Sequence, residues 1–189
     1  MDIKKIEGLW KKILEEIGED VKREGIKDTP ARISKMYLEL FQGYNKKKIP
    51  KITTFPNNSD GVEYDGIICE EGYFFSHCEH HGVPFFGKYH FAYFPNEKII
   101  GLSKIARIVD FYSSKLQVQE RLTKEIVDAI EKKLKPHGIA LILKARHLCK
   151  EMRGTKKIAG EMITSEMRGA FRSTNSGARQ EFLDLIKLR

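Results

Sequence analysis

Apolar residues near the N-terminus recur with the period of an α-helix. Between Ile3 and about Val21 they lie three or four positions apart, at Ile3, Ile6, Leu9, Trp10, Ile13, Leu14 and Ile17. This spacing predicts an amphipathic helix with one buried face. A second helix is predicted to begin with Thr29 as its N-cap and Pro30 at its first position, and to end at Gly43.

A polar segment follows these two helices. Residues 44–61 contain two prolines, three asparagines and three successive lysines, a composition typical of a loop or linker. We therefore expect an N-terminal helical segment with its linker over residues 1–61. A larger domain is expected over residues 62–189.

Strands and helices come in pairs in the larger domain. Strand-forming residues are dense from Val62 to Cys69, Gly87 to Pro95, Ile139 to Leu148 and Glu161 to Met167. Two helices lie in the middle, one capped by Ser103 and one from about Val118 to Leu134, and a closing helix covers residues 178–188. This order predicts an α+β domain, an antiparallel four-stranded sheet with two helices on one face.

Length and composition indicate a soluble globular protein. The chain has 189 residues, 41% of them hydrophobic and 32% charged, enough for one well-buried domain and an appendage. The charged N-terminus has no signal-peptide core, and no apolar run approaches the roughly 20 residues that span a membrane. Three cysteines are too few for a disulfide scaffold. We expect a cytoplasmic protein with free thiols and no membrane partner.

The net charge of +8 shows only that the surface favours anions. A solvated, lysine-rich exterior explains it as well as a nucleic-acid-binding surface does. The chain has neither a cysteine-rich finger nor an aromatic RNA-binding motif. We therefore expect no nucleic-acid partner.

Soft metal ligands are densest between His77 and His81, where Cys78 and His81 have C-x-x-H spacing. Zinc binds thiolate and imidazole, and a catalytic zinc site keeps one position open for water. His147 and Cys149 form a second cluster. On a strand they would share a face, so Cys149 could complete a three-ligand set with His147 beside the metal. Spacing leaves both His80 and His81 open as ligands, and the alternative is a surface histidine cluster with two inert cysteines.

Two further groups have the chemistry of a nucleotide site. The helix opened by Gly101 carries Ser103, Lys104 and Arg107 near its start, where backbone N–H groups and cations bind anions. The alternative is a capped amphipathic helix with exposed basic residues. Glu120 could accept two N–H donors from the Watson–Crick edge of guanine, or form an ordinary i,i+4 pair with Lys124.

Four motifs, in order along the chain, together resemble those of the GTP cyclohydrolase I family. They are Cys78-Glu79-His80-His81, Gly101-Leu102-Ser103-Lys104 with Arg107, Gln117-Val118-Gln119-Glu120-Arg121-Leu122-Thr123, and His147-x-Cys149-x3-Arg153-Gly154. The helix start at Asp28-Thr29-Pro30-Ala31-Arg32 is similar as well. The similarity runs from about Ile26 to Ile186.

The resemblance implies a tunnelling fold for the catalytic domain and a homodecamer of two stacked pentamers, with active sites between subunits. It implies a zinc ion on Cys78, His81 and Cys149, which selects His81 over His80. It also implies acid–base and substrate-binding groups. The acid–base histidines are His80 and His147, and the guanine-binding pair is Gln119 and Glu120. The triphosphate-binding positions are Ser103, Lys104, Arg107 and Arg153, with Arg32 as an addition from a neighbouring subunit. In the mechanism that we expect, Ser103 also serves as a proton relay at the ring oxygen of the ribose.

The implied reaction converts GTP and water to 7,8-dihydroneopterin triphosphate and formate. Zinc-bound water attacks C8 of guanine, the ring opens and loses formate, and the ribose rearranges before the new ring closes. One alternative is a same-fold enzyme that reduces a deazaguanine nitrile with NADPH through a metal-free cysteine, against which the zinc motif argues. Another is a structural zinc or nucleic-acid-binding module, whose fourth ligand would be Cys69 or His80.

Three positions depart from the family pattern. His77 replaces a common Met, Gly82 a larger apolar residue, and Lys144 an acidic residue three positions before His147. The resemblance assigns no role to any of them, so we expect changes in the shape of the pocket rather than in the reaction. The pathway that takes the product, whether folate, biopterin or deazapurine, stays open, as does allosteric control.

Overall fold

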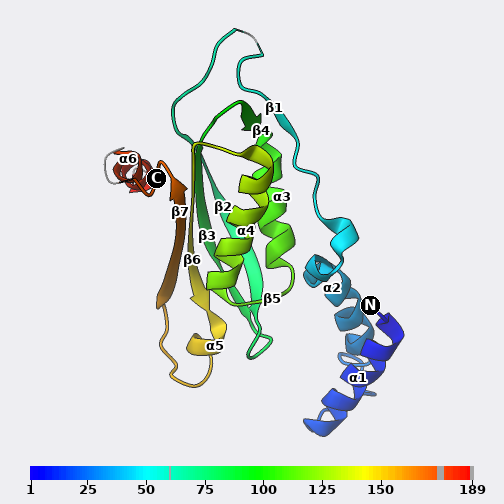
Figure 1. Cartoon of the computed structure of the whole chain (residues 1–189). Coiled ribbons are helices and arrows are strands. Elements are labelled where there is room, and N and C mark those ends of the chain that lie inside the picture. Colours follow the sequence, from blue (N-terminus) through cyan, green and yellow to red (C-terminus); the bar gives the residue numbers. More distant parts are fainter. Residues whose placement is uncertain (60, 174–176, 188–189) are drawn as a thin grey trace.

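A five-stranded sheet in the order β5-β2-β3-β6-β7 forms the centre of the computed structural model (Figure 1). The structure describes residues 1–189 except 60, 174–176 and 188–189. Four strands are antiparallel neighbours, and they are β2 (Ile68–Cys78), β3 (Pro84–Phe94), β6 (Gly138–His147) and β7 (Glu161–Gly169). The two-residue strand β5 (Leu116–Gln117) runs parallel to the end of β2.

Helices cover the two faces of this sheet unequally. Helices α3 (Leu102–Ser113) and α4 (Gln119–Leu134) lie on one face (Figure 1), over a core that includes Phe74, Phe91, Tyr93, Ile108, Leu122, Ile126 and Leu141. On the other face, α6 (Ala178–Lys187) packs through Phe182 against Ala92 and Ala140. Successive residues of β6 point to opposite faces, so burial on both sides explains its almost uninterrupted apolar run.

The predicted α+β architecture is confirmed, and the strands differ from the prediction in several places, among them β3, which begins at Pro84 rather than Gly87. β5 was not predicted, because two residues carry no detectable alternation and pair only where the α3–α4 connection meets His77 and Cys78. β2 begins at Ile68 rather than Val62 and reaches Cys78. In its second half Phe74, Ser76 and Cys78 are buried, and Ser76 donates to the Ser113 carbonyl of the helix layer, so packing extends the strand beyond the apolar stretch at its start.

Two helices at the N-terminus pack against each other as a hairpin. They are α1 (Ile3–Glu16) and α2 (Thr29–Leu40). α1 is shorter than predicted and ends before Gly18, which has a φ of +89°. The N-cap of α2 is Asp28 and not Thr29, so that prediction was wrong by one residue. The division of the chain near residue 61 stays a prediction.

The connection to the sheet is irregular. It contains two 3-10 turns, η1 (Gln42–Tyr44) and η2 (Lys46–Lys48), and a short strand β1 (Thr54–Pro56) that pairs with β4 (Lys98–Ile100). The backbone N–H of Gly101 continues this pairing by donating to the Thr53 carbonyl at 3.0 Å. Gly101 is therefore the N-cap of α3, and Ser103 lies in its first turn. The prediction that Ser103 caps the helix was wrong.

The remaining helix boundaries agree closely with expectation. α4 ends at Leu134, followed by Lys135 in the left-handed conformation with a φ of 50°. α6 is described to Lys187, and its predicted last residue, Leu188, lies outside the described residues. No helix within the described ranges is both long enough and apolar enough to cross a bilayer.

Gly87 is required where β3 approaches β6. A Cβ atom there would lie 1.9 Å from the Lys144 carbonyl oxygen and 2.7 Å from the Cα of Ala145, and neither backbone atom can move without separating the strands. We expect Gly87→Ala to lower the free energy of unfolding by about 3 kcal/mol or more, measured by denaturant titration. Gly8→Ala on α1 is the control. No atom lies within 4 Å of the added methyl group, so a gain of about 0.5–1 kcal/mol is expected. Equal stability of the two variants would contradict the assigned strand packing.

Candidate functional site

The turn between β2 and β3 brings Cys78 and His81 together. Cys78 is the last residue of β2, and its carbonyl accepts hydrogen bonds from the N–H groups of His81 (3.3 Å) and Gly82 (2.8 Å). Gly82 has a φ of +69°, a conformation that strains residues with a side chain. The Sγ of Cys78 lies 3.7 Å from Nδ1 of His81. The departure to glycine at position 82 therefore suits this tight turn.

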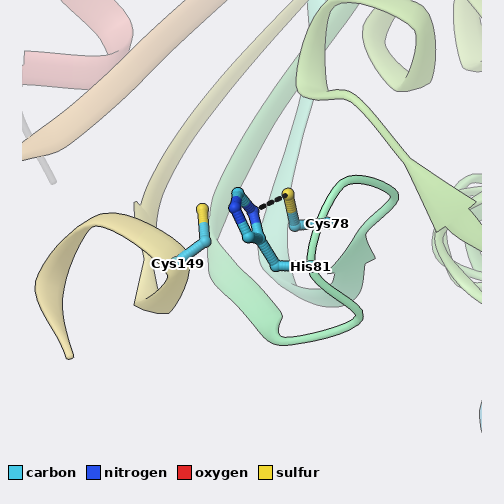
Figure 2. Close-up of side chains that lie close together, drawn as sticks. All are labelled: Cys78, His81 and Cys149. Atoms are coloured by element: carbon cyan, nitrogen blue, oxygen red, sulfur yellow. Dashed lines mark hydrogen bonds between the residues drawn. The ribbon is translucent and has the colours of Figure 1, made fainter. Parts of the chain in front are cut away.

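Cys149 reaches the same point from the end of β6. The strand stops at His147, and a single helical turn, α5 (Leu148–Glu151), follows. The ligand atoms of Cys78, His81 and Cys149 all lie within 4.8 Å of one another (Figure 2). The expectation that Cys149 shares a strand face with His147 was wrong. The helical turn, and not strand alternation, directs the thiol toward Cys78.

The geometry of this group fits a tetrahedral metal ion. Tetrahedral zinc with ordinary bond lengths to sulfur and nitrogen separates its ligand atoms by roughly 3.6–3.8 Å, and the distance from Cys78 Sγ to His81 Nδ1 is 3.7 Å. Two thiols and one imidazole are soft donors of the kind zinc prefers. Within the described residues, this is the group of three side chains found close enough to hold a metal ion.

Burial and the neighbouring thiol act on Cys149. Burial raises the pKa of its thiol, and the nearby Cys78 adds to this effect, whereas the charge of Arg153 opposes it. Without a cation the Cys149 thiol therefore favours the protonated form. A metal ion reverses this preference because the thiolate is the form that binds.

His80 lies beside the cluster but differs from His81 in its surroundings. Its Nδ1 is 3.8 Å from Cys78 Sγ, yet its side chain is 65% exposed and its Nε2 lies 4.0 Å from Glu79. His81, and not His80, belongs to the three-residue group with Cys149. The geometry thus favours the choice of ligand that the family resemblance implied.

His147 is held from two sides at the end of β6. Its ring stacks on Phe85, with centroids 4.6 Å apart and planes within 3°. Its Nε2 lies 2.8 Å from Oε1 of Gln119. Burial lowers the pKa of the imidazole, partly offset by the negative charge of Glu120. Its pKa lies below the usual histidine range, and the neutral form is therefore favoured at neutral pH.

The Gln119 amide determines which nitrogen of His147 carries the proton. Gln119 is 1% exposed, and its Nε2 faces three acceptors within 3.1 Å, the carbonyls of Leu143 and Met162 and the hydroxyl of Thr164. Reversing the amide would place its oxygen against two carbonyl oxygens, so Oε1 faces His147 and can only accept. Nε2 of His147 is therefore the donor. The resemblance implied a base contact for this side chain, whereas the structure encloses it against His147.

A cavity of about 370 Å³ opens beside the cluster. It is lined by His147, Cys149, Lys150, Gly160, Glu161 and Met162. This volume lies in the range of small-molecule sites. Glu120 follows the buried Gln119 in the chain and is exposed, and its charge reaches His147. A free carboxylate is thus available near the histidine that faces the cavity.

The predicted triphosphate cations are not brought together in one chain. Ser103, Lys104 and Arg107 lie at the start of α3, at the opposite end of the sheet from α5 and the β2–β3 turn (Figure 1). The carbonyl of Ser113, at the other end of α3, accepts a hydrogen bond from Ser76 at 2.8 Å. Ten helical residues, about 15 Å, thus separate Ser103 from the metal end.

The other two predicted triphosphate residues differ from each other. Arg153 is exposed and close enough to Cys149 to act on its pKa. Arg32 is exposed on α2 and forms an i,i+4 ion pair with Asp28 at 3.3 Å. Of the predicted phosphate-binding cations, Arg153 is therefore the one whose charge acts on the metal end.

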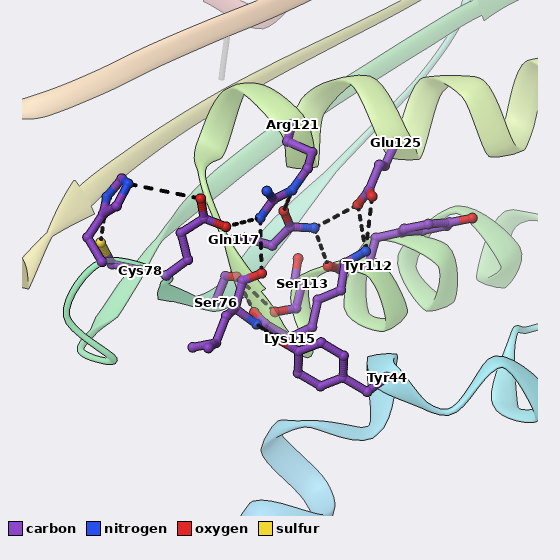
Figure 3. A network of polar contacts seen from close by, with 12 residues as sticks. Tyr44, Ser76, Cys78, Tyr112, Ser113, Lys115, Gln117, Arg121 and Glu125 are labelled. Carbon is purple, nitrogen blue, oxygen red and sulfur yellow. Dashed lines mark hydrogen bonds and ion pairs between the residues drawn. The ribbon is translucent and has the colours of Figure 1, made fainter.

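Sequence reasoning missed several residues that support the site. Arg121 donates to Glu79, which lies in the metal-binding turn, and to Oε1 of the buried Gln117 at 2.8 Å. Figure 3 shows Gln117 and Arg121 within this polar network. The signal available was the i,i+4 spacing of Gln117 and Arg121 at a helix start. No comparable sequence signal points to the stacking of Phe85 on His147.

The remaining departures from the family pattern have local partners. Lys144 pairs with Glu161 at 2.8 Å, which offsets its position directly opposite Lys88 in the β3–β6 ladder. His77 is buried, with its ring 5.1 Å from that of Phe41. Both residues change contacts around the site without replacing a member of the metal-binding group.

Comparison with known proteins identifies the family of this chain. The model of the family described as GTP cyclohydrolase I matches residues 6–187. GTP cyclohydrolase 1 of Methylococcus capsulatus is 46% identical over 181 residues, 96% of this chain and 96% of the relative. GTP cyclohydrolase 1 of Saccharomyces cerevisiae is 44% identical over 190 residues, 99% of this chain and 76% of the relative.

A solved structure of a more distant protein is also similar. It is the archaeosine synthase QueF-Like in the apo form, with a TM-score of 0.49 and 13% sequence identity over 57% of this chain and 97% of that one. Family membership rests on the matches over nearly the whole chain. The chain belongs to the GTP cyclohydrolase I family of enzymes, as the sequence motifs predicted.

Proposed function

We propose that this protein is a zinc-dependent hydrolase that converts GTP and water to 7,8-dihydroneopterin triphosphate and formate. The observation that carries the proposal is the grouping of Cys78, His81 and Cys149 within 4.8 Å, next to His147 and a cavity of about 370 Å³. Relatives at 42–46% identity bear the name GTP cyclohydrolase 1. The metal-binding group and the name of the relatives support the same reaction.

Cys78, His81 and Cys149 are the residues that would hold zinc. A zinc ion with three protein ligands supplies a bound water whose pKa falls to about 7, so that hydroxide is available at neutral pH. The rest of the chemistry depends on where the chain places proton donors, acceptors and substrate contacts.

His147 and His80 are the residues proposed to move protons. Because Gln119 keeps the proton of His147 on Nε2, its Nδ1 is left to accept a proton and return it. The lowered pKa of His147 keeps the imidazole neutral at neutral pH, the form that can accept a proton. His80 is exposed on the β2–β3 turn, where it can exchange protons with solvent. The pair divides proton transfer between an enclosed and an open position.

Glu120 is proposed to hold the guanine base. Guanine presents N1–H and the exocyclic amino group side by side, and a carboxylate can accept both. Glu120 is exposed, and its negative charge acts on His147. Gln119 would contribute by holding His147 and by positioning the backbone that carries Glu120.

A complete site requires a second copy of the chain. The cations Lys104 and Arg107, with Ser103 as the proposed proton relay, lie at the far end of α3, and we propose that a neighbouring subunit brings them to the triphosphate. Arg32 is assigned to a neighbour in the same way. Within the described residues β5 covers β2 only at His77 and Cys78, and β7 forms the other edge of the sheet. Head-to-tail pairing of such edges can close a ring, and the homodecamer of two stacked pentamers that we propose follows from the family resemblance.

Incubation with GTP tests the reaction directly. We expect formate release and, after oxidation of the product, a fluorescent pterin, because the proposed chemistry removes C8 and rebuilds a six-membered ring. One molecule of formate should be released for each molecule of pterin formed. NADPH oxidation with a deazaguanine nitrile, in the absence of formate from GTP, would instead identify the reductase alternative.

Replacement of either thiol ligand should remove the metal and the activity together. We expect Cys78→Ser and Cys149→Ser to lose bound zinc and turnover, because a hydroxyl is a poor substitute for thiolate at such a site. Zinc is measured by atomic emission on the purified protein and turnover by formate release. The matched control is Cys69→Ser, since Cys69 packs with the residues around α6, and it should keep its zinc. Full turnover by a metal-free Cys149→Ser protein would refute the ligand set.

Loss of His147 should separate metal binding from turnover. We expect His147→Ala to retain zinc and to lower kcat by about 10²–10⁴-fold, the usual contribution of general acid–base catalysis. Gln119→Leu should also lower kcat, with little change in KM for GTP, because the Gln119 amide acts on His147. A rise in KM at constant kcat would show that Gln119 contacts the base instead. Zinc loss from His147→Ala would show that this residue is a ligand.

A further inference from the structure

A series of polar contacts connects the first turn of α4 to the turn that carries Cys78 and His81 (Figure 3). Nη2 of Arg121 donates to Oε2 of Glu79, the residue between Cys78 and His80. The same nitrogen donates to the Leu116 carbonyl at 3.2 Å, and Nε donates to Oε1 of Gln117 at 2.8 Å. Three acceptors therefore hold the guanidinium in one orientation.

The contacts behind Arg121 are buried. Gln117 is 0% exposed, and its Nε2 donates to the Tyr112 carbonyl at 3.0 Å and to Glu125 at 2.7 Å. Glu125 also pairs with Lys115 at 2.8 Å. Because the amide nitrogen of Gln117 has these two acceptors, its oxygen is turned toward Arg121. The orientation of Arg121 is thus fixed from inside the fold.

Backbone pairing holds the same turn on its other side. Cys78 is the partner of Gln117 in the parallel β2–β5 ladder, and the N–H of Glu79 donates to the Gln117 carbonyl at 3.0 Å. Glu79 is therefore attached to the β5–α4 junction through both its backbone and its side chain.

We propose that Arg121, acting through Glu79, is a positioning residue for the metal centre, and that it holds the turn in the conformation that aims Cys78 and His81 at one ion. The inference rests on the metal site of the proposed function. It also means that three successive residues in the first turn of α4 all serve the site. Gln119 orients His147, Glu120 presents a carboxylate, and Arg121 orients the ligands, so one helix start aligns the proton-transfer, base-binding and metal groups.

An ordinary surface ion pair would behave differently. The side chains of Arg121 and Glu79 are 42% and 33% exposed, and pairs at such positions contribute little to stability. A pair that acts only on stability would shift the unfolding temperature slightly and leave metal affinity unchanged. Groups that orient metal ligands instead change metal affinity or activity by about 10–100-fold when removed.

The test compares metal binding by the full-length chain and two variants, Arg121→Met and Glu79→Gln. Zinc affinity is measured by competition with a chromophoric chelator, and site geometry by the visible absorption of the Co²⁺-loaded protein. We expect zinc to bind about 10–100-fold more weakly in both variants, with altered Co²⁺ bands. The double variant should bind zinc no more weakly than the single variant with the lower zinc affinity, because the two residues act as a unit.

Two further variants sharpen the result. Arg121→Lys should restore zinc affinity only in part, since an ammonium cannot reproduce the planar guanidinium with its fixed N–H directions. Lys124→Met removes an ion pair with Asp128 (3.3 Å) on the same helix, and it should leave zinc affinity and the Co²⁺ spectrum unchanged. Glu79→Gln changes no side-chain volume at a partly exposed position, so it tests the inference even if Arg121→Met fails to fold.

The outcomes separate this inference from the function on which it rests. Unchanged zinc affinity and Co²⁺ bands in Glu79→Gln, with a wild-type protein that binds zinc and releases formate from GTP, would overturn the role of Arg121 and leave the proposed function standing. A wild-type protein that binds no zinc would overturn both. Equal weakening by Lys124→Met would show a general charge effect and would also overturn the positioning role.

Discussion

The antiparallel pairing of β3 with β2 on one side and β6 on the other is the constraint on which the site depends. His77 lies opposite Pro84, and Phe85 lies opposite His147, so the end of β2, the start of β3 and the end of β6 lie together at one end of the sheet. A shift of register by one residue would turn every side chain to the other face. The close approach of the two backbones at Gly87 opposes such a shift between β3 and β6.

Residues at the start of α4 fix the orientation of side chains at this end of the sheet. Gln117 and Gln119 are buried amides whose hydrogen-bonding groups are satisfied within the fold. Leaving a buried amide without partners costs free energy, so each amide has one favoured orientation. In that orientation Gln117 accepts a hydrogen bond from Arg121, and Gln119 accepts one from His147. The precision of the exposed turn therefore comes from polar contacts inside the domain and not from the turn itself.

The division of the substrate site between the ends of the sheet links function to assembly. The metal-binding group and His147 lie at one end, whereas the basic first turn of α3 lies at the other. In the proposed function, a second copy of the chain supplies the basic group that contacts the triphosphate. The open edges of β2 and β7 among the described residues provide the surfaces through which copies can pair.

The sequence by itself determined the α+β class, the two helices on one face, the clustering of Cys78 and His81, and the family, because periodicity, short-range spacing and motif order are local properties. Only the tertiary structure decided that Cys149 reaches Cys78 from a helical turn, that Gln119 faces His147, that β5 pairs with β2, and that Arg121 meets Glu79. Each of these depends on where strands end and how they pair. Residues 42 positions apart, such as Glu79 and Arg121, meet through the packing of the whole domain, which no local pattern encodes.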